Sequence, residues 1–231
     1  MKGLTRYNMK IVAEVLSGTS YNFQLLDSLG NRPVIVDCGA NIGSFSLACK
    51  TRLPDCQIIA VEPDKDLFDA LKDNLSHLDS VLLIHAALTD SDGTISLMSG
   101  KKDGVSNSIF TGEMVSETSL SIVESKAMCK FLSDIKDRYR GIDVLKMDTE
   151  GAEWFLLDIP DTTLSGIGVI YMEFHSAEFF PQLCSKLAVT HIIHNANIRF
   201  PHRGEVTWIR KDMLAAEQKI YEIRPPVAKS V

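Results

Sequence analysis

The sequence predicts an α/β fold in which helices cover both faces of a mostly parallel sheet. Two observations support this prediction. Short apolar runs rich in β-branched residues recur along the chain, and segments with helical spacing of apolar residues separate them. Such runs are typical of strands buried on both faces. Strands that alternate with helices are typical of parallel sheets. A length of 231 residues suits one domain of this class.

The strands are predicted from apolar runs that stop at a glycine or an acid. They are expected at 33–37, 56–61, 81–84, 142–147 and 166–173. A minor strand at 95–97 follows the turn at Asp92 and Gly93. The segments 190–194 and 205–210 resemble a closing antiparallel pair.

The helices are predicted from apolar periodicity and from signals at their ends. They are expected at 11–16, 43–52, 64–78, 130–139 and 177–187. Pro54 ends the second of these helices, and Asp64 is placed to cap the third. Residues 99–126 are rich in Ser, Gly, Thr and Lys, which predicts a long loop or partly helical insertion over the site.

Composition and charge limit the domain plan and the partners. We expect a short helical lead-in over 1–32, one domain over 33–223 and an irregular tail over 224–231. The net charge of -6 lacks the basic footprint of a nucleic-acid-binding protein. No apolar stretch approaches the roughly 20 residues that cross a bilayer, and the start lacks a signal peptide pattern. The five cysteines form no CxxC pair, which favours a cytoplasmic location; oligomeric state is left open.

The segment from Asp37 to Gly43 is predicted to be a cofactor-binding turn. Gly39 allows a sharp turn after the strand, Gly43 opens the next helix, and Asn41 tolerates strained turn geometry. Glu62 ends the following strand, where a carboxylate is expected to accept hydrogen bonds from ribose hydroxyls. This combination indicates a nucleotide or S-adenosylmethionine (SAM) site; a plain strand–turn–helix with a solvated acid is the alternative.

The acid at the start of the turn favours SAM over a dinucleotide. A dinucleotide site is expected to carry G-x-G-x-x-G, with a pyrophosphate at the helix N-terminus. Here Asp37 occupies the first position. A carboxylate is unfavourable beside a pyrophosphate but favourable near the sulfonium and ammonium groups of SAM. An NAD(P)-dependent oxidoreductase and a non-catalytic SAM-binding protein remain the alternatives.

The segments 36–43, 61–63, 87–90 with Gly93, 142–153 and 173–175 together match the pattern of a known family. On these segments, from about residue 33 to residue 210, the sequence resembles the FkbM family of SAM-dependent methyltransferases. The segment 146–153 is much more specific to this family than 36–43. The resemblance implies a Rossmann-like class I methyltransferase fold, with a seven-stranded sheet whose last strand is antiparallel. It also implies methyl transfer, usually to a hydroxyl oxygen, so we expect a small-molecule or glycan acceptor.

The resemblance also implies which residues bind the cofactor. Glu62 would hold the ribose, the adenine would lie along Ala86 and Ala87, and Asp148 would sit beside the methionine end and the acceptor. The full set expected to contact SAM is Asp37, Gly39, Ala40, Asn41, Gly43, Glu62, Ala86, Ala87 and Asp148.

The predicted catalytic residues are Asp148, Glu173 and His175. A hydroxyl acceptor needs its proton removed or its oxygen polarised. His175 is a candidate general base because the pKa of a histidine lies near neutrality, and a structural histidine is the alternative. Glu150 and Glu153 lie near an expected helix start, which favours a structural role for Glu153 and leaves Glu150 open. No metal is assigned, although Asp148, Glu173 and His175 offer a possible ligand set for a divalent ion.

Overall fold

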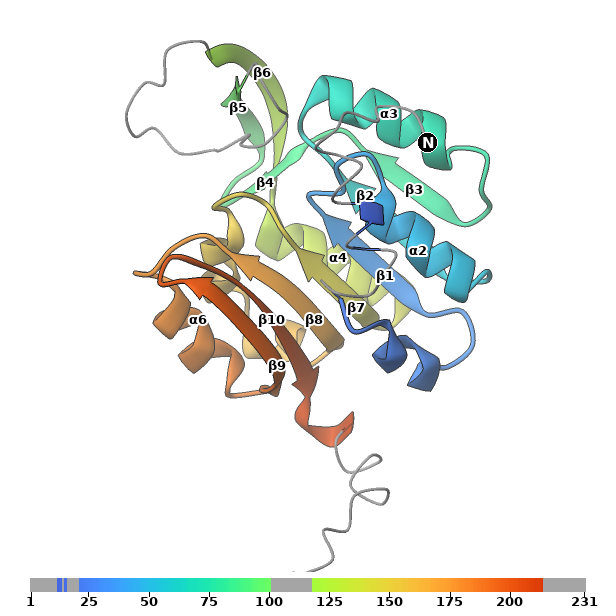
Figure 1. The fold of residues 1–231 in the computed structure, drawn as a ribbon, viewed down its shortest axis with the longest axis vertical. Helices are drawn as coiled ribbons and strands as arrows, with labels where there is room; N and C mark the ends of the chain where they lie inside the picture. Colours follow the sequence, from blue (N-terminus) through green and yellow to red (C-terminus); the bar gives the residue numbers. More distant parts are fainter. Residues whose placement is uncertain (1–11, 14, 16–20, 101–117, 214–231) are drawn as a thin grey trace, which may run out of the picture.

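A seven-stranded sheet forms the centre of the structure, a computed structural model that describes residues 12, 13, 15, 21–100 and 118–213 (Figure 1). Its strands are β1 (Val34–Cys38), β2 (Gln57–Val61), β3 (Val81–Ile84), β7 (Ile142–Met147), β8 (Ile167–Phe174), β9 (His191–Phe200) and β10 (Arg203–Arg210). Their order is β3-β2-β1-β7-β8-β10-β9. Neighbouring strands pair in parallel along the series β3, β2, β1, β7 and β8, and β10 is antiparallel to both β8 and β9. The predicted fold class is therefore confirmed.

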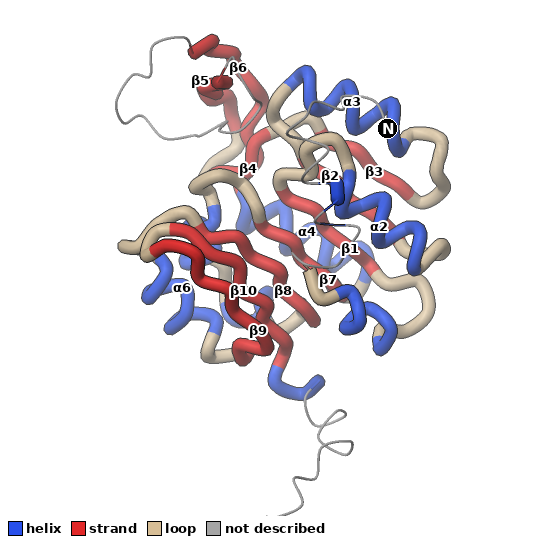
Figure 2. Tube along the Cα trace, viewed as in Figure 1, coloured by secondary structure: helices blue, strands red, loops and turns tan. Residues whose placement is uncertain are grey.

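Helices cover both faces of this sheet (Figure 2). One face packs against η1 (Phe23–Ser28), α2 (Ser44–Arg52) and α3 (Lys65–Leu75). The other packs against α4 (Met128–Tyr139), η2 (Glu153–Asp158), α5 (Asp161–Leu164) and α6 (Phe180–Leu187). Successive side chains of a strand point to opposite faces. Accordingly, Val34 and Val36 join the α4 side of the core, whereas Ile35 joins the α2 side.

The same alternation places charged residues on the α2 face near the ends of the strands. Ile35 on β1 and Val144 on β7 both belong to the core on the α2 side. Two positions further along, Asp37 and Lys146 share that face and are register partners between the two parallel strands. The chain thus directs an acid and a base to the carboxyl edge of the sheet, where parallel α/β folds bind ligands.

A second, three-stranded sheet corrects one sequence prediction. It contains β4 (Ala87–Thr89), β5 (Gly93–Gly100) and β6 (Thr118–Ala127), in the order β4-β6-β5. The expected loop over 99–126 is therefore wrong for 118–126, and the minor strand at 95–97 extends in both directions. Val123 is buried, whereas Ile122 is 81% exposed. The polar composition of β6 did not predict a strand. Backbone pairing with β5 stabilises β6, and only one of its faces is buried.

Several sequence predictions lie wholly or partly outside the described residues. These are the helix at 11–16, the tail at 224–231 and the middle of the predicted loop. The helix expected from 177 begins at Phe180, and Gly43 caps α2 from outside the helix. Within the described part of the chain, every helix is too short or too polar to span a bilayer.

Candidate functional site

The turn between β1 and α2 requires glycine at two positions. Gly39 and Gly43 have φ angles of 75° and 90°, in the left-handed region that favours glycine. A Cβ on Gly39 would lie 1.8 Å from the backbone oxygen of Asp148, so the turn packs directly against the end of β7. The amides of Gly39 and Ala40 both donate to the Val61 carbonyl, each at 3.0 Å. The turn is therefore fixed between β2 and β7, as a rigid ligand-binding turn needs to be.

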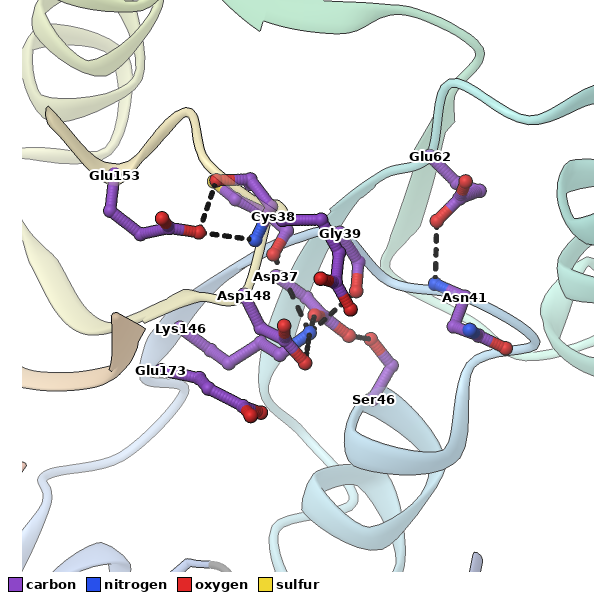
Figure 3. Close-up of polar contacts among 12 residues, drawn as sticks. Asp37, Cys38, Gly39, Asn41, Ser46, Glu62, Lys146, Asp148, Glu153 and Glu173 are labelled. Carbon is purple, nitrogen blue, oxygen red and sulfur yellow. Dashed lines mark hydrogen bonds and ion pairs between the residues drawn. The ribbon is translucent and has the colours of Figure 1, made fainter. Parts of the chain in front are cut away.

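Glu62 faces this turn from the end of β2 (Figure 3). Its Oε2 accepts a hydrogen bond from the Asn41 amide at 2.8 Å, and its Oε1 accepts one from the Asp64 amide at 2.9 Å. The residue is 4% exposed, and burial raises the pKa of Glu62 to about 7 despite these two bonds. Each carboxylate oxygen can accept a second hydrogen bond, so Glu62 retains acceptor capacity for hydroxyl groups.

Asp37 has a cation and a hydroxyl partner within the protein. Its side chain is fully buried. Oδ2 accepts a 2.6 Å hydrogen bond from Ser46 Oγ, and Oδ1 lies 3.2 Å from Lys146 Nζ. The Asp37 charge therefore meets a lysine and not an open cavity. The assignment of Asp37 to the cofactor site stays a prediction. In the structure its carboxylate pairs with Lys146 and accepts a hydrogen bond from Ser46 on α2.

Lys146 is a central site residue that sequence analysis missed. Its side chain is 5% exposed. In addition to Asp37, its Nζ donates to the carbonyl oxygen of Gly39 at 2.5 Å and of Cys38 at 3.4 Å, and lies 3.8 Å from Asp148 Oδ2 (Figure 3). Burial lowers the pKa of Lys146, but Asp37, Tyr21 and Asp148 together outweigh burial and raise it. The available signal was a single lysine in the otherwise apolar end of β7.

His175 lies among carboxylates, which bears on the two roles that the sequence left open, a general base and a structural histidine. Its Nδ1 is 3.3 Å from Glu153 Oε1, and its Nε2 is 3.4 Å from Glu150 Oε2 and 3.8 Å from Glu173 Oε1. Burial lowers the pKa of His175, but Glu153 and the other acids outweigh burial and raise it to about 9. The imidazole is therefore protonated at neutral pH, which favours a charge-balancing role over proton abstraction.

Asp148 and Glu173 do meet at the edge of the sheet, as the sequence predicts. Asp148 has a partly exposed side chain (27%), and burial raises its pKa while Lys146 opposes that shift. Glu173 Oε1 accepts a 2.6 Å hydrogen bond from Arg203 Nε. Arg203 was not predicted, because it reaches Glu173 through the pairing of β10 with β8 and carries no local sequence signal.

Glu153 has a structural role, as expected, and it acts through hydrogen bonds to the turn after β7. Its Oε1 accepts hydrogen bonds from the amide and hydroxyl of Thr149, both at 2.9 Å, and Oε2 accepts one from the Gly151 amide at 3.1 Å. Burial acts to raise the pKa of Glu153, but the bonds from His175 and Thr149 outweigh burial and lower it. Glu153 thus fixes the turn after β7, where Glu150 has a φ of 51°.

Tyr21 is a further side chain that sequence analysis missed. Its ring contacts Phe45 on α2 edge-on, with centroids 4.9 Å apart, and Tyr171 on β8 at 5.5 Å. Burial is the main cause that raises the pKa of its phenol, and the charges of Lys146 and Asp148 also act on it. The Tyr21 ring therefore packs beside α2 and β8, where the charges of the site act on its phenol.

The remaining predicted residues and the possible metal ligands have defined places. Ala86 and Ala87 are buried at the start of β4, so any contact with adenine would be made by their backbone or by the small exposed part of their side chains.

Ligand atoms of Asp148, Glu173 and His175 lie within 4.8 Å of one another. A small hollow lies beside His175. It is lined by Gly151, Glu153, Trp154, Phe174, His175, Ser176, Phe179 and Leu183.

Comparison with known proteins identifies one family. Residues 37–200 match the family described as "Methyltransferase FkbM domain". Methyltransferase sdnD of Sordaria araneosa is 31% identical over 171 residues, which cover 62% of this chain and 65% of that protein. The 2-O-methyltransferase NoeI of Sinorhizobium fredii is 26% identical, covering 64% and 65%. The hexuronic acid methyltransferase AglP of Haloferax volcanii is 27% identical, covering 66% and 60%.

A solved structure supports the same architecture. The crystal structure of methyltransferase FkbM from Methylobacillus flagellatus covers 79% of this chain and 45% of its own, with a TM-score of 0.53 and 14% identity. That likeness concerns the fold alone. The matched part of this chain spans less than two thirds of each of the curated relatives named above.

Proposed function

Since the chain belongs to the FkbM methyltransferase family, we propose that it transfers the methyl group of SAM to a hydroxyl oxygen of a small molecule or glycan. The observation that carries this proposal is the contact between the Gly39 turn and Asp148. The residues suited to hold the cofactor and the residue suited to receive the acceptor proton share one edge of the sheet. A methyl transfer needs that proximity.

The charges of the site fit a cationic cofactor. The acids are Asp37, Asp148, Glu150, Glu153 and Glu173, and the cations are Lys146, His175 and Arg203. The acids outnumber the cations, and burial in their company raises the pKa of Glu150 to about 7. A sulfonium and an ammonium group would offset this excess, whereas a pyrophosphate would add to it. The site therefore supports SAM over NAD(P).

Each cofactor-site residue has a role that follows from its geometry. Glu62 would accept hydrogen bonds from the ribose hydroxyls, and the Gly39–Gly43 turn would allow the methionine end to approach the backbone. Bound SAM supplies an electrophilic methyl group, so the protein needs only to orient it and to prepare the acceptor.

Asp148 is the residue proposed to take the acceptor proton. It is partly exposed at the end of β7, and burial holds its pKa above the usual range, which brings it closer to that of a useful base. Glu173 is fixed by Arg203, and protonated His175 stabilises the neighbouring carboxylates. In this mechanism Glu173 orients the acceptor hydroxyl and His175 keeps the acids in place.

A divalent ion is the alternative way to activate the hydroxyl. Asp148, Glu173 and His175 present two carboxylates and an imidazole, which suit such an ion. However, Lys146 and Arg203 already compensate Asp148 and Glu173. We therefore favour transfer without a metal. Full activity after dialysis against EDTA supports this choice, and loss of activity that Mg²⁺ or Mn²⁺ restores would reverse it.

We propose a sugar hydroxyl as the first acceptor class to test, because relatives are described as a 2-O-methyltransferase and a hexuronic acid methyltransferase. The acidic site favours a neutral sugar over a uronate. The five cysteines are free, which supports a cytoplasmic location.

The direct test uses SAM labelled on its methyl group with a panel of neutral sugars, uronates and small-molecule alcohols. The wild type should label an oxygen, Asp148→Asn should lose most of that labelling, and Glu178→Gln, an exposed acid near the site, should retain it. Label on nitrogen, or equal transfer by Asp148→Asn, would reject the proposed chemistry.

A further inference from the structure

We propose that Lys146 is a positioning residue that holds the cofactor turn and the proposed base, Asp148, in one arrangement. The inference rests on the proposed function and extends it to a buried residue, whose side chain is 5% exposed. Lys146 would act through its neighbours, by keeping the Gly39 carbonyl and the Asp148 carboxylate at fixed positions around one ammonium group.

The strand geometry explains how one lysine reaches both groups. Lys146 is the register partner of Asp37 and stands on the face of β7 that packs toward α2. From there its Nζ is 3.2 Å from Asp37 Oδ1, 2.5 Å from the Gly39 carbonyl oxygen and 3.8 Å from Asp148 Oδ2. An ammonium group has three N–H donors. The oxygens of Asp37 and Gly39 lie within donor reach of Lys146, whereas Asp148 Oδ2 lies at ion-pair distance.

The contacts exceed what a counter-ion for Asp37 requires. Asp37 is already held by Ser46 Oγ at 2.6 Å, and one N–H of Lys146 would complete its pairing. The bond to the Gly39 carbonyl is the shortest that Lys146 makes. It fixes the turn from inside, opposite the amides that donate to Val61.

Burial makes a purely stabilising role a poor explanation. Lys146 and Asp37 have side chains that are 5% and 0% exposed. Removing two opposite charges from water costs about as much as their attraction returns, so buried ion pairs contribute little net stability. An uncharged pair of similar size would satisfy the packing. What it would not supply is the donor to the turn or the positive charge beside Asp148.

The consequence for the reaction is a link between cofactor binding and proton removal. Burial raises the pKa of Asp148, and the charge of Glu173 adds to that shift and repels the Asp148 carboxylate, whereas Lys146 lowers the pKa. The ammonium group of Lys146 donates to the Gly39 carbonyl oxygen, and it attracts Asp148 toward the turn. Without Lys146, both the turn and Asp148 would lose a common anchor.

The test separates this role from simple charge pairing by a double variant. Lys146→Met alone leaves Asp37 buried without its cation, so its lower melting temperature decides nothing. Asp37→Asn combined with Lys146→Met removes both charges and keeps similar volumes, so most of the stability should return. If Lys146 positions the turn and Asp148, this double variant should still show SAM affinity about 10-fold weaker and kcat about 100-fold lower than Asp37→Asn alone, which controls for the predicted contact of Asp37 with SAM; this is on the scale of a 1 Å misplacement.

Lys146→Arg provides a second test of the positioning role if the double variant does not fold. It keeps Asp37 paired, but its longer planar head cannot occupy the ammonium position without moving the turn. We expect a lower kcat and weaker SAM binding by calorimetry. Lys72→Met on the surface of α3 is the matched control and should leave both unchanged.

The outcomes distinguish this inference from the proposed function. If the wild type transfers methyl groups and the folded double variant retains the kcat and SAM affinity of Asp37→Asn, Lys146 is only a counter-ion and the inference fails. Wild-type kcat and affinity in Lys146→Arg would overturn it as well. If the wild type transfers no methyl group to any acceptor, the proposed function fails, while calorimetry with SAM still tests the effect of Lys146 on the turn.

Discussion

Replacing Gly39 by alanine should disable the cofactor turn with little change elsewhere. The added Cβ would lie 1.8 Å from the Asp148 carbonyl oxygen, where contacts under 3.0 Å are essentially never observed. Relief therefore requires the turn and the end of β7 to separate by roughly 1 Å. In addition, an alanine at a φ of 75° costs about 1–2 kcal/mol relative to glycine.

These two effects give the expected magnitudes. A loss of about 2 kcal/mol lowers the melting temperature by roughly 4–8 °C in a chain of this size. Displacement of the turn by about 1 Å should weaken SAM binding by on the order of 100-fold. Calorimetry with SAM and thermal unfolding without it measure the two effects separately.

Gly30→Ala is the matched control, because a Cβ there meets no atom within 4 Å. It should bind SAM with wild-type affinity and melt at the wild-type temperature. If Gly39→Ala binds SAM within twofold of the wild type, the turn does not carry the cofactor in the way proposed here.

Three further substitutions test separate parts of the account. Glu62→Gln should weaken SAM binding by about 10-fold, because the glutamine side chain has one acceptor oxygen and cannot accept from both backbone N–H groups and from the ribose. An unchanged SAM affinity by calorimetry would argue against the ribose contact. Asp148→Asn should lower kcat by about 100-fold or more while SAM affinity stays within threefold, and a wild-type kcat would exclude Asp148 as the base. His191 is buried and hydrogen-bonded to the Ile167 carbonyl, and burial lowers its pKa to about 4. The folded protein therefore favours neutral His191, and this contribution to the free energy of unfolding is complete above pH 6.5 and is lost as pH falls toward 4. Denaturant unfolding should show about 2 kcal/mol more loss between pH 7 and pH 5 in the wild type than in His191→Gln, and equal losses would contradict that assignment.

The local parts of the site were predictable from the sequence. The apolar run before Asp37, the glycines of the turn and the acid at Glu62 are short-range patterns, and the structure places them at one edge of the sheet. The meeting of Asp148 with Glu173 also followed, because parallel neighbouring strands end at the same edge.

The ion pairs across strands were not predictable in the same way. Lys146 meets Asp37 through the register of β7 on β1, and Arg203 meets Glu173 through the antiparallel pairing of β10 on β8. A shift of either register by one residue would turn these side chains to the other face. Local composition contains no information about that register.

The protonation state of His175 and the strand β6 illustrate the same limit. A histidine pKa near neutrality is a property of the isolated side chain, whereas the acids around His175 come from β8, the turn after β7 and the start of η2. Likewise, β6 is a strand because β5 pairs with it, although its composition is that of a loop.

The central claim is that the glycine turn and Glu62 hold SAM. Calorimetric titration of the purified chain with SAM, and in parallel with NAD, tests it most directly. The account predicts one SAM bound per chain and no heat from NAD. Binding of NAD with no binding of SAM would contradict it.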